Sequence, residues 1–341
     1  MAVSMRDVAA LAGVSSRTVS NVVRGYVHVS PDTRRRVQRA IDELKYRPNV
    51  NARSLRRGRT GIIALALPEI AAPYFAELAN HVQRWAVDRG VTLLIDQTGA
   101  SHERELLVLG GYGSHAIDGL IFSPAAVTME ELEDQALDIP TVILGEKIPG
   151  GPFVHVVIDN VTAARQAVEH LIASGRRRIA AVGANLGAIN IGPATARLEG
   201  YHEALRGAGM PTFPELVVAT GEWNRASGHA AVTTLLRSGV AVDALFCFND
   251  VLAMGAVRAL VDLGLRVPDD IAVCGWDDIE ESRYAVPTLT TVSPDKEGIA
   301  RAAVDALLEQ ISGEASGVTD VVGAHTLLVR ESTTWVRSRP S

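Results

Sequence analysis

The chain has 341 residues, of which 47% are hydrophobic and 21% charged, so it can bury a large core and lacks the composition of a disordered protein. This length exceeds the usual size of one core, and two or three folding units are expected. No apolar run approaches the ~18 residues of a membrane span, and residues 1–20 lack the order of a secretory signal, which predicts a cytoplasmic protein without a membrane partner.

The charge is distributed unevenly along the chain. The formal net charge is −6, but residues 1–60 carry thirteen basic and four acidic side chains, which leaves +9 on this segment and −15 on the remainder. A short basic head on an acidic body is typical of a module that binds a polyanion. A solvated basic face is the alternative, and charge alone does not decide between them.

The head begins with a predicted pair of short helices. Residues 6–11 suit a helix in which Val8 and Leu11 share one face, and Gly13 then supplies a turn. The second helix is expected to direct Val19, Val22 and Val23 toward the core. Its opposite face carries polar side chains that are free to meet base edges, namely Arg17, Asn21 and Arg24.

A third helix is predicted from Ser30-Pro31, a cap followed by a proline at the first helical position. Val37, Ile41 and Leu44 then repeat at helical spacing. Three short helices with a tight glycine turn between the first two are the geometry that inserts a recognition helix into the major groove. The alternative is a small helical bundle without this function, against which the positive charge of the segment argues.

The runs Met5–Val23, Val29–Arg34 and Leu44–Asn49 resemble, in order and spacing, the N-terminal signature of the lactose/galactose repressor (LacI/GalR) family of bacterial transcription regulators. The resemblance implies that base-reading side chains fall on Ser16, Arg17 and Asn21. This is chemically sound, because Arg pairs bidentately with guanine and Asn with adenine. Double-stranded operator DNA is therefore the expected macromolecular partner.

The composition of residues 49–60 indicates a basic, flexible linker, in which Leu55 is surrounded by polar neighbours. The family resemblance implies instead a hinge helix that folds on DNA and inserts Leu55 into the minor groove. An apolar wedge between base steps costs unstacking energy, which is offset because bent DNA wraps more of the protein surface. Arg53 and Arg56 would contact phosphates or the groove floor.

From Gly61 onward, apolar runs of strand length alternate with helical stretches, the pattern of βαβ units in parallel sheets. The strand candidates are Ile62–Leu67, Thr92–Ile95, Gly119–Phe122, Thr141–Leu144, Val154–Ile158, Ile179–Val182, Ala244–Phe248 and Ile271–Gly275. Helices are expected over Tyr74–Arg89, Thr162–Ser174 and Asp250–Leu263. Cys247 and Cys274 lie in two of the strands, have no metal-binding spacing, and are expected to be reduced and buried; no metal or cofactor is expected.

The body resembles the two-lobed α/β effector core of the same family and of periplasmic sugar-binding proteins. The expected division is a head over 1–48, a hinge over 49–60, a first lobe over 61–160 with 292–322, and a second lobe over 161–291 with 323–341. The chain would cross between lobes near Asp159–Asn160, Thr291–Val292 and Val322–Ala324.

Parallel sheets bind ligands at the carboxyl ends of their strands, and the candidate effector residues lie there. The resemblance assigns the effector-binding aspartate to Asp277, the asparagine to Asn249, the arginine to Arg197 and a ring-stacking aromatic to Trp223. Phe75, or its neighbour Tyr74, would face them from the other lobe. A carboxylate that accepts hydroxyls beside Arg and Asn donors suits a polyol.

Structural roles are the alternatives at these positions. Asp250, next to Asn249, can merely cap the following helix, Arg197 can hold a surface ion pair, and Tyr74 or Phe75 can belong to the core. Gly145-Glu146 stands where many relatives carry an effector-contacting aspartate, and Ile191 stands where purine-responsive relatives carry an arginine. The expected effector is therefore a sugar or a related polar molecule.

The sequence thus predicts a homodimeric regulator, acting as a repressor on a palindromic site, whose operator binding is linked to its effector. A solute-binding transport protein would share the body but would need a signal peptide and no basic head. An enzyme is not expected, because the chain has no GxSxG, HExxH or P-loop motif.

Overall fold

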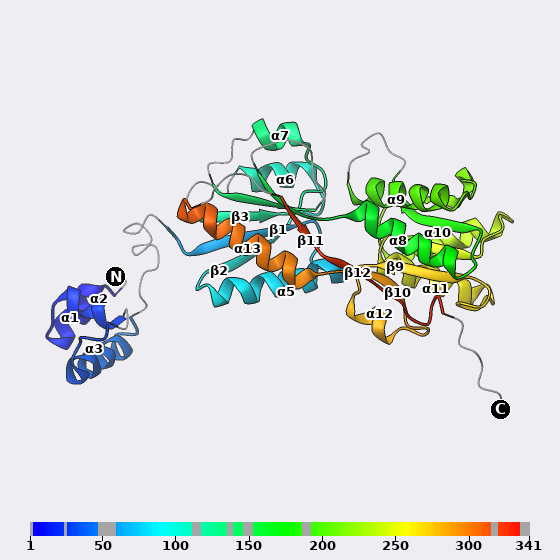
Figure 1. Ribbon diagram of the computed structural model, residues 1–341. Coiled ribbons are helices and arrows are strands. Elements are labelled where there is room, and N and C mark those ends of the chain that lie inside the picture. The colour runs from blue at the N-terminus through cyan, green and yellow to red at the C-terminus, as the bar shows by residue number, and fades with distance from the viewer. Residues whose placement is uncertain are drawn as a thin grey trace, which may run out of the picture. The chain divides into compact units, whose positions relative to one another are not determined.

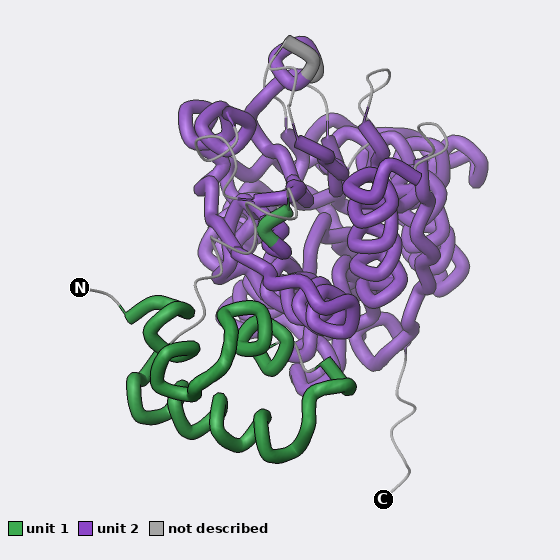
Figure 2. Tube along the Cα trace, turned by 90° about the vertical axis from the view of Figure 1, so that its left-hand side faces the viewer, with its two compact units in different colours: residues 1–60 green, residues 61–341 purple. Residues whose placement is uncertain are grey.

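The computed structural model describes residues 3–23, 26–46, 59–110, 117–134, 139–145, 153–185, 192–314 and 320–334. The chain divides into two compact units, residues 1–60 and residues 61–341 (Figure 2). Within the described residues, no helix is long and apolar enough to cross a membrane.

The first unit contains three helices, α1 (Met5–Ala12), α2 (Ser16–Val23) and α3 (Pro31–Glu43). Its core is built from buried side chains of all three helices and Tyr46, namely Val8, Ala9, Ala12, Val19, Val22, Val37, Ala40 and Tyr46. Leu11 was expected beside Val8 but is 48% exposed. The helix is one residue longer at each end than predicted, and it buries the smaller Ala9 and Ala12 instead.

The turn between α1 and α2 depends on Gly13, whose φ of 62° lies in the left-handed region. Its N–H closes the end of α1 on Ala10, as a glycine C-cap does. At the other end of α1, the Ser4 side chain accepts from the Asp7 N–H, and the Asp7 carboxylate accepts from the Ser4 N–H. Both ends of the first helix are thus defined by local hydrogen bonds.

The second unit contains two six-stranded sheets, each of which defines a lobe. The first sheet has the order β11-β5-β4-β3-β1-β2 and is parallel throughout. Its strands are β1 (Ile62–Leu67), β2 (Thr92–Gln97), β3 (Gly119–Phe122), β4 (Thr141–Leu144), β5 (Val154–Ile158) and β11 (Val321–Gly323). Its helices are α5 (Pro73–Asp88), α6 (His102–Leu109), α7 (Met129–Asp134) and α13 (Lys296–Ser312).

Helices cover both faces of the first sheet. Ile63, Leu65 and Leu67 of β1 pack against α5 and α13, whereas Ala64 and Ala66 face α6 and α7 (Figure 1). This alternation is the period of two expected of a strand that is buried on both faces.

The second sheet has the order β12-β10-β9-β8-β6-β7, in which only β12 runs antiparallel to its described neighbour. Its strands are β6 (Ile179–Ala184), β7 (Val217–Ala219), β8 (Ala244–Cys247), β9 (Ala272–Trp276), β10 (Thr290–Pro294) and β12 (His325–Leu328). Its helices are α8 (Asn160–Ala173), α9 (Pro193–Gly207), α10 (Arg225–Arg237), α11 (Asp250–Asp262), α12 (Glu280–Tyr284) and a 3₁₀ turn over Pro214–Leu216.

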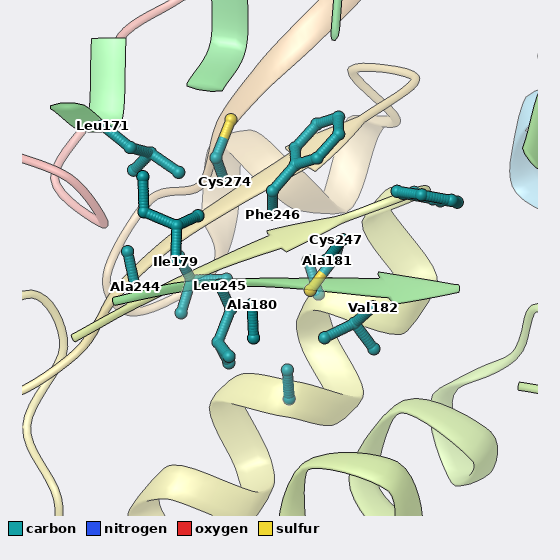
Figure 3. Packing of buried hydrophobic residues seen from close by; sticks show 14 of the residues in the cluster. Leu171, Ile179, Ala180, Ala181, Val182, Ala244, Leu245, Phe246, Cys247 and Cys274 are labelled. Atoms are coloured by element: carbon teal, nitrogen blue, oxygen red, sulfur yellow. The ribbon is translucent and has the colours of Figure 1, made fainter. Parts of the chain in front are cut away.

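The helices α10 and α11 pack in unusually close contact. A Cβ added to Gly255 of α11 would lie 2.0 Å from the Arg225 carbonyl oxygen at the start of α10. Figure 3 shows part of the core of this lobe, where Cys247 and Cys274 lie among hydrophobic side chains. Both thiols are buried as expected, and burial raises the pKa of each.

The described chain crosses between the sheets at three places: after β5, after β10 and between β11 and β12 (Figure 1). The second crossing was expected at Thr291–Val292. It follows Pro294 instead, because all of β10 pairs with β9 and β12 in the second sheet.

Candidate functional site

The second helix of the head exposes the polar side chains that were predicted to read bases. Thr18 N–H donates to the Ser15 side chain at 3.1 Å and so fixes the start of α2. Ser16 and Arg17 in the first turn are exposed, and Asn21, one turn later, is partly exposed. Since Val19 and Val22 are buried on the other side, the helix presents a polar face to solvent.

Four of the predicted DNA contacts lie outside the described residues: Arg24 after α2, and Arg53, Leu55 and Arg56 of the hinge.

In the second lobe, Arg197 of α9 is the centre of a buried polar cluster. The side chain is 6% exposed, donates to the Asn160 side chain at 2.9 Å, and also donates to the Phe248 carbonyl oxygen. Its guanidinium carbon lies 4.0 Å from the ring centre of Trp276 and 5.2 Å from that of Trp223. The alternative of a surface ion pair is therefore wrong, and Arg197 is held in a fixed orientation between two aromatic rings.

Trp223 and Asn249 join this cluster from the segments that follow β7 and β8, the two strands that flank β6. Trp223 precedes α10 and donates its indole N–H to the Gly183 carbonyl oxygen at 3.0 Å. Asn249 donates to the Trp223 carbonyl oxygen at 3.4 Å, and its own side-chain oxygen accepts from the Leu252 N–H at 2.8 Å. Asn249 is thus the residue that caps α11, a role that the sequence had offered to Asp250.

Asp250 instead holds the neighbouring chain segments together. Its buried carboxylate accepts from the Ile279 N–H and from the hydroxyls of Ser282 and Thr291 at 2.7–3.1 Å. Burial raises the pKa of Asp250 to about 7, although these three hydrogen bonds oppose the shift. This network fixes the position of the segment that follows β9.

Asp277 is the first residue of that segment and has a left-handed backbone, with φ of 114°. Such a conformation costs a non-glycine residue ~1–3 kcal/mol and persists only where surrounding contacts impose it. The residue is 8% exposed, and among the described residues nothing hydrogen-bonds to its carboxylate. Burial raises the pKa of Asp277 to about 8, opposed by the charge of Arg197.

Asp278, the adjacent carboxylate, is fully paired. It forms ion pairs with Arg283 at 2.9 Å and Arg330 at 2.6 Å and accepts from the Ser293 hydroxyl. Burial by itself would raise its pKa, but the hydrogen bonds from the two arginines outweigh burial and hold it below its ordinary value. Asp278 therefore has a structural role, whereas Asp277 remains available to a ligand.

From the first lobe, Tyr74 of α5 interacts electrostatically with Asp277 and Arg197. Its pKa is raised by burial and, next, by the charge of Asp277, while Arg197 acts in the opposite direction. Phe75 packs edge-on against Tyr74, with ring centres 5.3 Å apart, and both rings pack partly against the first-lobe core. Of the pair suggested by the sequence, Tyr74 is the one that reaches the predicted effector residues.

The structure thus brings together Arg197, Trp223, Asn249, Asp277 and Tyr74, and it places Phe75 behind Tyr74. Sequence reasoning missed Asn160 and Trp276, both of which contact Arg197. Their positions at the end of β5 and at the end of β9 could have indicated them, since Asn249 and Asp277 also follow the ends of strands. Gly145 is exposed, and Glu146 and Ile191 lie outside the described residues. Among those described, no group of His, Cys, Asp and Glu could hold a metal ion.

A helix-turn-helix head followed by a two-lobed α/β body defines a class of bacterial DNA-binding transcription regulators. Residues 4–49 match the family described as bacterial regulatory proteins, lacI family, and residues 168–333 match the periplasmic binding protein-like domain. The HTH-type transcriptional regulator CelR of Thermobifida fusca is 38% identical over 96% of this chain and 98% of its own length. The HTH-type transcriptional repressor PurR of Haemophilus influenzae is 34% identical over 92% and 93%.

Solved structures support the same family assignment. The lac repressor dimer bound to operator and the anti-inducer ONPF superposes with a TM-score of 0.85 at 29% identity, covering 98% of this chain and 99% of that one. A CelR–cellobiose complex superposes with a TM-score of 0.71 at 34% identity, covering 97% and 99%. The chain belongs to the LacI family. It is a DNA-binding transcription regulator and not an enzyme.

Proposed function

We propose that this regulator binds a palindromic operator as a homodimer in the cytoplasm and releases or engages it in response to a sugar. The cluster of Arg197 from α9 with Trp223, Asn249 and Asp277 from segments that follow strands of the second lobe is the observation that carries the proposal. Its chemistry is that of a sugar site, because an arginine and a carboxyl group hydrogen-bond hydroxyls and an indole packs against the apolar face of a sugar ring.

The relatives support this choice of ligand. CelR, 34% identical in the solved complex, is described with cellobiose bound. A β-linked disaccharide is therefore the first probe, with purine bases as the contrasting class, since PurR is also a relative. The ligand would lie on the strand ends of the second lobe, with Tyr74 facing it from the first lobe.

In the head, Ser16, Arg17 and Asn21 would read base edges in the major groove, with Arg24 at the end of the same helix. Residues 49–60 would form the hinge, in which Leu55 enters the minor groove and Arg53 and Arg56 contact the backbone. The lobes would comprise residues 61–160 with 295–323 and residues 161–294 with 324–341, which moves the expected second boundary to the end of β10.

Two features support a dimer. The lac repressor chain that superposes on this one comes from a dimer bound to operator. In this chain the second lobe exposes Tyr284 at the end of α12 and Val286 shortly after it, which are 76% and 90% exposed. Large apolar side chains that gather on a surface are typical of subunit interfaces.

The testing experiment selects binding sites from random duplex DNA with the full-length protein and then titrates the selected site in the presence of sugars and purines. Recovery of a palindrome whose binding is altered by a sugar supports the proposal. Recovery of a palindrome that responds only to purines would refute the choice of effector, and failure to enrich any site would refute specific recognition under these conditions.

A further inference from the structure

A largely buried ion pair, in which Glu77 is partly exposed, lies at the boundary between the two lobes, beside Asp277. Lys296, the first residue of α13, lies 2.6 Å from the Glu77 carboxylate of α5. The Lys296 side chain is 10% exposed and that of Glu77 is 28% exposed. Both helices pack on the first sheet, so both partners belong to the first lobe.

Lys296 also donates to the second lobe. Its ammonium donates to the carbonyl oxygens of Asp277 at 2.6 Å and Asp278 at 2.9 Å. Together with Glu77, these oxygens use all three donors of the ammonium group. Asp277 and Asp278 both have left-handed backbones, with φ of 114° and 47°, and Lys296 therefore bonds directly to the two peptide units that adopt this unusual turn.

Glu77 makes a second contact across the lobes. One of its carboxylate oxygens accepts from the Glu280 N–H at 2.8 Å, while the other faces Lys296. Glu77 lies three residues after Tyr74 on α5, so the helix that supplies the first-lobe aromatic also holds the segment that bears the Asp277 carboxylate. A rotation that moves α5 and α13 away from residues 277–280 must break these hydrogen bonds.

We propose that Glu77 and Lys296 are an interlobe positioning pair, which holds the Asp277–Asp278 turn so that the Asp277 carboxyl group faces the effector and links occupancy of that site to the angle between the lobes. The inference rests on the proposed effector site, which it deepens. The pair touches the peptide units that carry Asp277 and acts on the effector through them.

The electrostatics agree with this geometry. The charge of Lys296 lowers the pKa of Asp277 and that of Glu77 raises it, so both partners of the pair act on the same carboxyl group. A buried ammonium that loses its carboxylate, or a buried carboxylate that loses its ammonium, is left with an uncompensated charge. Removal of either partner alone should therefore disturb the turn that both of them hold.

The first test measures the angle between the lobes without any ligand. Spin labels are attached at Asp88→Cys in the first lobe and at Glu199→Cys in the second, two positions at the protein surface. Pulsed electron paramagnetic resonance then measures the distance between the labels, and hence between the lobes. Cys247 and Cys274 are buried and do not compete for the label. In full-length protein, Lys296→Met should broaden or shift the distance distribution. An unchanged distribution would overturn the role of the pair in fixing the lobes.

The second test measures binding of cellobiose, or of the first sugar that the operator titration identifies, by calorimetry. Lys296→Met and Glu77→Gln should each weaken binding by about tenfold or more. The double variant should be no weaker than the worse single variant, because the partners act together. Additive losses, or affinities equal to that of the wild type, would refute a positioning pair.

Asp305→Asn serves as the control, and Glu77→Gln keeps the test decisive if Lys296→Met fails to fold. Asp305→Asn breaks the ion pair between Arg89, the C-cap of α5, and Asp305 of α13. This pair joins the same two helices away from the second lobe, so its loss should change neither readout. Glu77→Gln can still accept from the Glu280 N–H, so it should remain folded if Lys296→Met does not. If the wild type binds no sugar, the proposed function fails, but the distance measurement still decides whether the pair holds the lobes.

Discussion

At the level of single residues, the two consecutive carboxylates Asp277 and Asp278 have opposite environments. Asp278 is neutralised by two arginines, while Asp277 is buried beside Arg197 and its pKa is raised to about 8. A residue that keeps its proton in the folded protein at a pH where the unfolded chain has lost it makes stability fall as the pH rises. The stability cost of burying Asp277 therefore grows as the pH rises from about 4 to about 8 and remains in full above pH 8, as is common for functional residues.

Asp277→Asn should remove sugar binding and leave operator affinity unchanged. Asn tolerates the left-handed backbone that Ala would strain, so the change isolates the carboxylate. At about pH 7 the variant should also be more stable than the wild type by ~1–3 kcal/mol, and the gain should vanish toward about pH 4. Calorimetry with sugar and urea unfolding at both pH values measure these effects. Unaltered sugar affinity would exclude Asp277 from the site.

Sugar affinity of the wild type should rise as the pH is raised from about 6 to about 8, because hydroxyl donors favour the ionised carboxylate and the pKa of Asp277 lies near the end of this range. Titrations in a single buffer series test the slope. In Asp277→Asn any residual binding should show no such slope, and a slope that persists there would assign the titration to Asp250 or another group.

Arg17→Ala should weaken operator binding by ~1–3 kcal/mol and relax the preference at one base pair. Arg17 is exposed in the first turn of α2, where an arginine can pair with guanine. Arg39→Ala removes an equally exposed charge from α3 and serves as the control, with a small loss that is uniform across sequences. Equal losses on operator and random DNA in Arg17→Ala would argue against base reading.

At the level of elements, close helix packing sets the tolerance of the second lobe to substitution. Gly255→Ala would force α11 away from the backbone of α10 and should cost ~1–3 kcal/mol or more. Gly207→Ala, at the open end of α9, meets no atom within 4 Å and should be neutral or stabilising by a few tenths of a kcal/mol. Thermal unfolding of both variants provides the comparison, and equal midpoints would contradict the packing argument.

The length and hydrophobicity of each strand explain which strands could be predicted from the sequence. The eight strands expected from long apolar runs, such as Ile62–Leu67 and Thr141–Leu144, are present with bounds within two residues. The strands β7, β10, β11 and β12 were not predicted, because they are short or carry polar residues such as Thr290 and Ser293. Such strands are defined by their neighbours in the sheet and not by their own hydrophobicity.

The same distinction holds for the site. The sequence predicted that Arg197, Trp223, Asn249 and Asp277 lie at strand ends and form one site. The structure brings the four together, but it places Arg197 within the helix α9. The contacts of Lys296 could not be predicted, because they depend on how the start of a helix meets a segment more than fifteen residues away along the chain. Local sequence patterns contain no information on contacts between segments that are distant along the chain.

At the level of the whole molecule, head and body are separate compact units. A chain that begins at Gly61 should therefore fold and bind sugar within about twofold of the full-length affinity, and it should have lost operator binding. Calorimetry and a gel-shift titration on the truncated chain test both statements. Loss of sugar binding in a folded truncated chain would show that the head contributes to the effector site.

The segment 321–328 adds an edge strand to each sheet in turn, as β11 and β12, with only Ala324 between them. Together with the crossings after β5 and β10, it tethers the two sheets at three points in the described chain. Three tethers leave few ways for two rigid bodies to move, so translation is restrained and rotation about one axis remains. A protease that cut one crossing would leave the lobes joined by the other two, and the nicked protein would still turn about nearly the same axis.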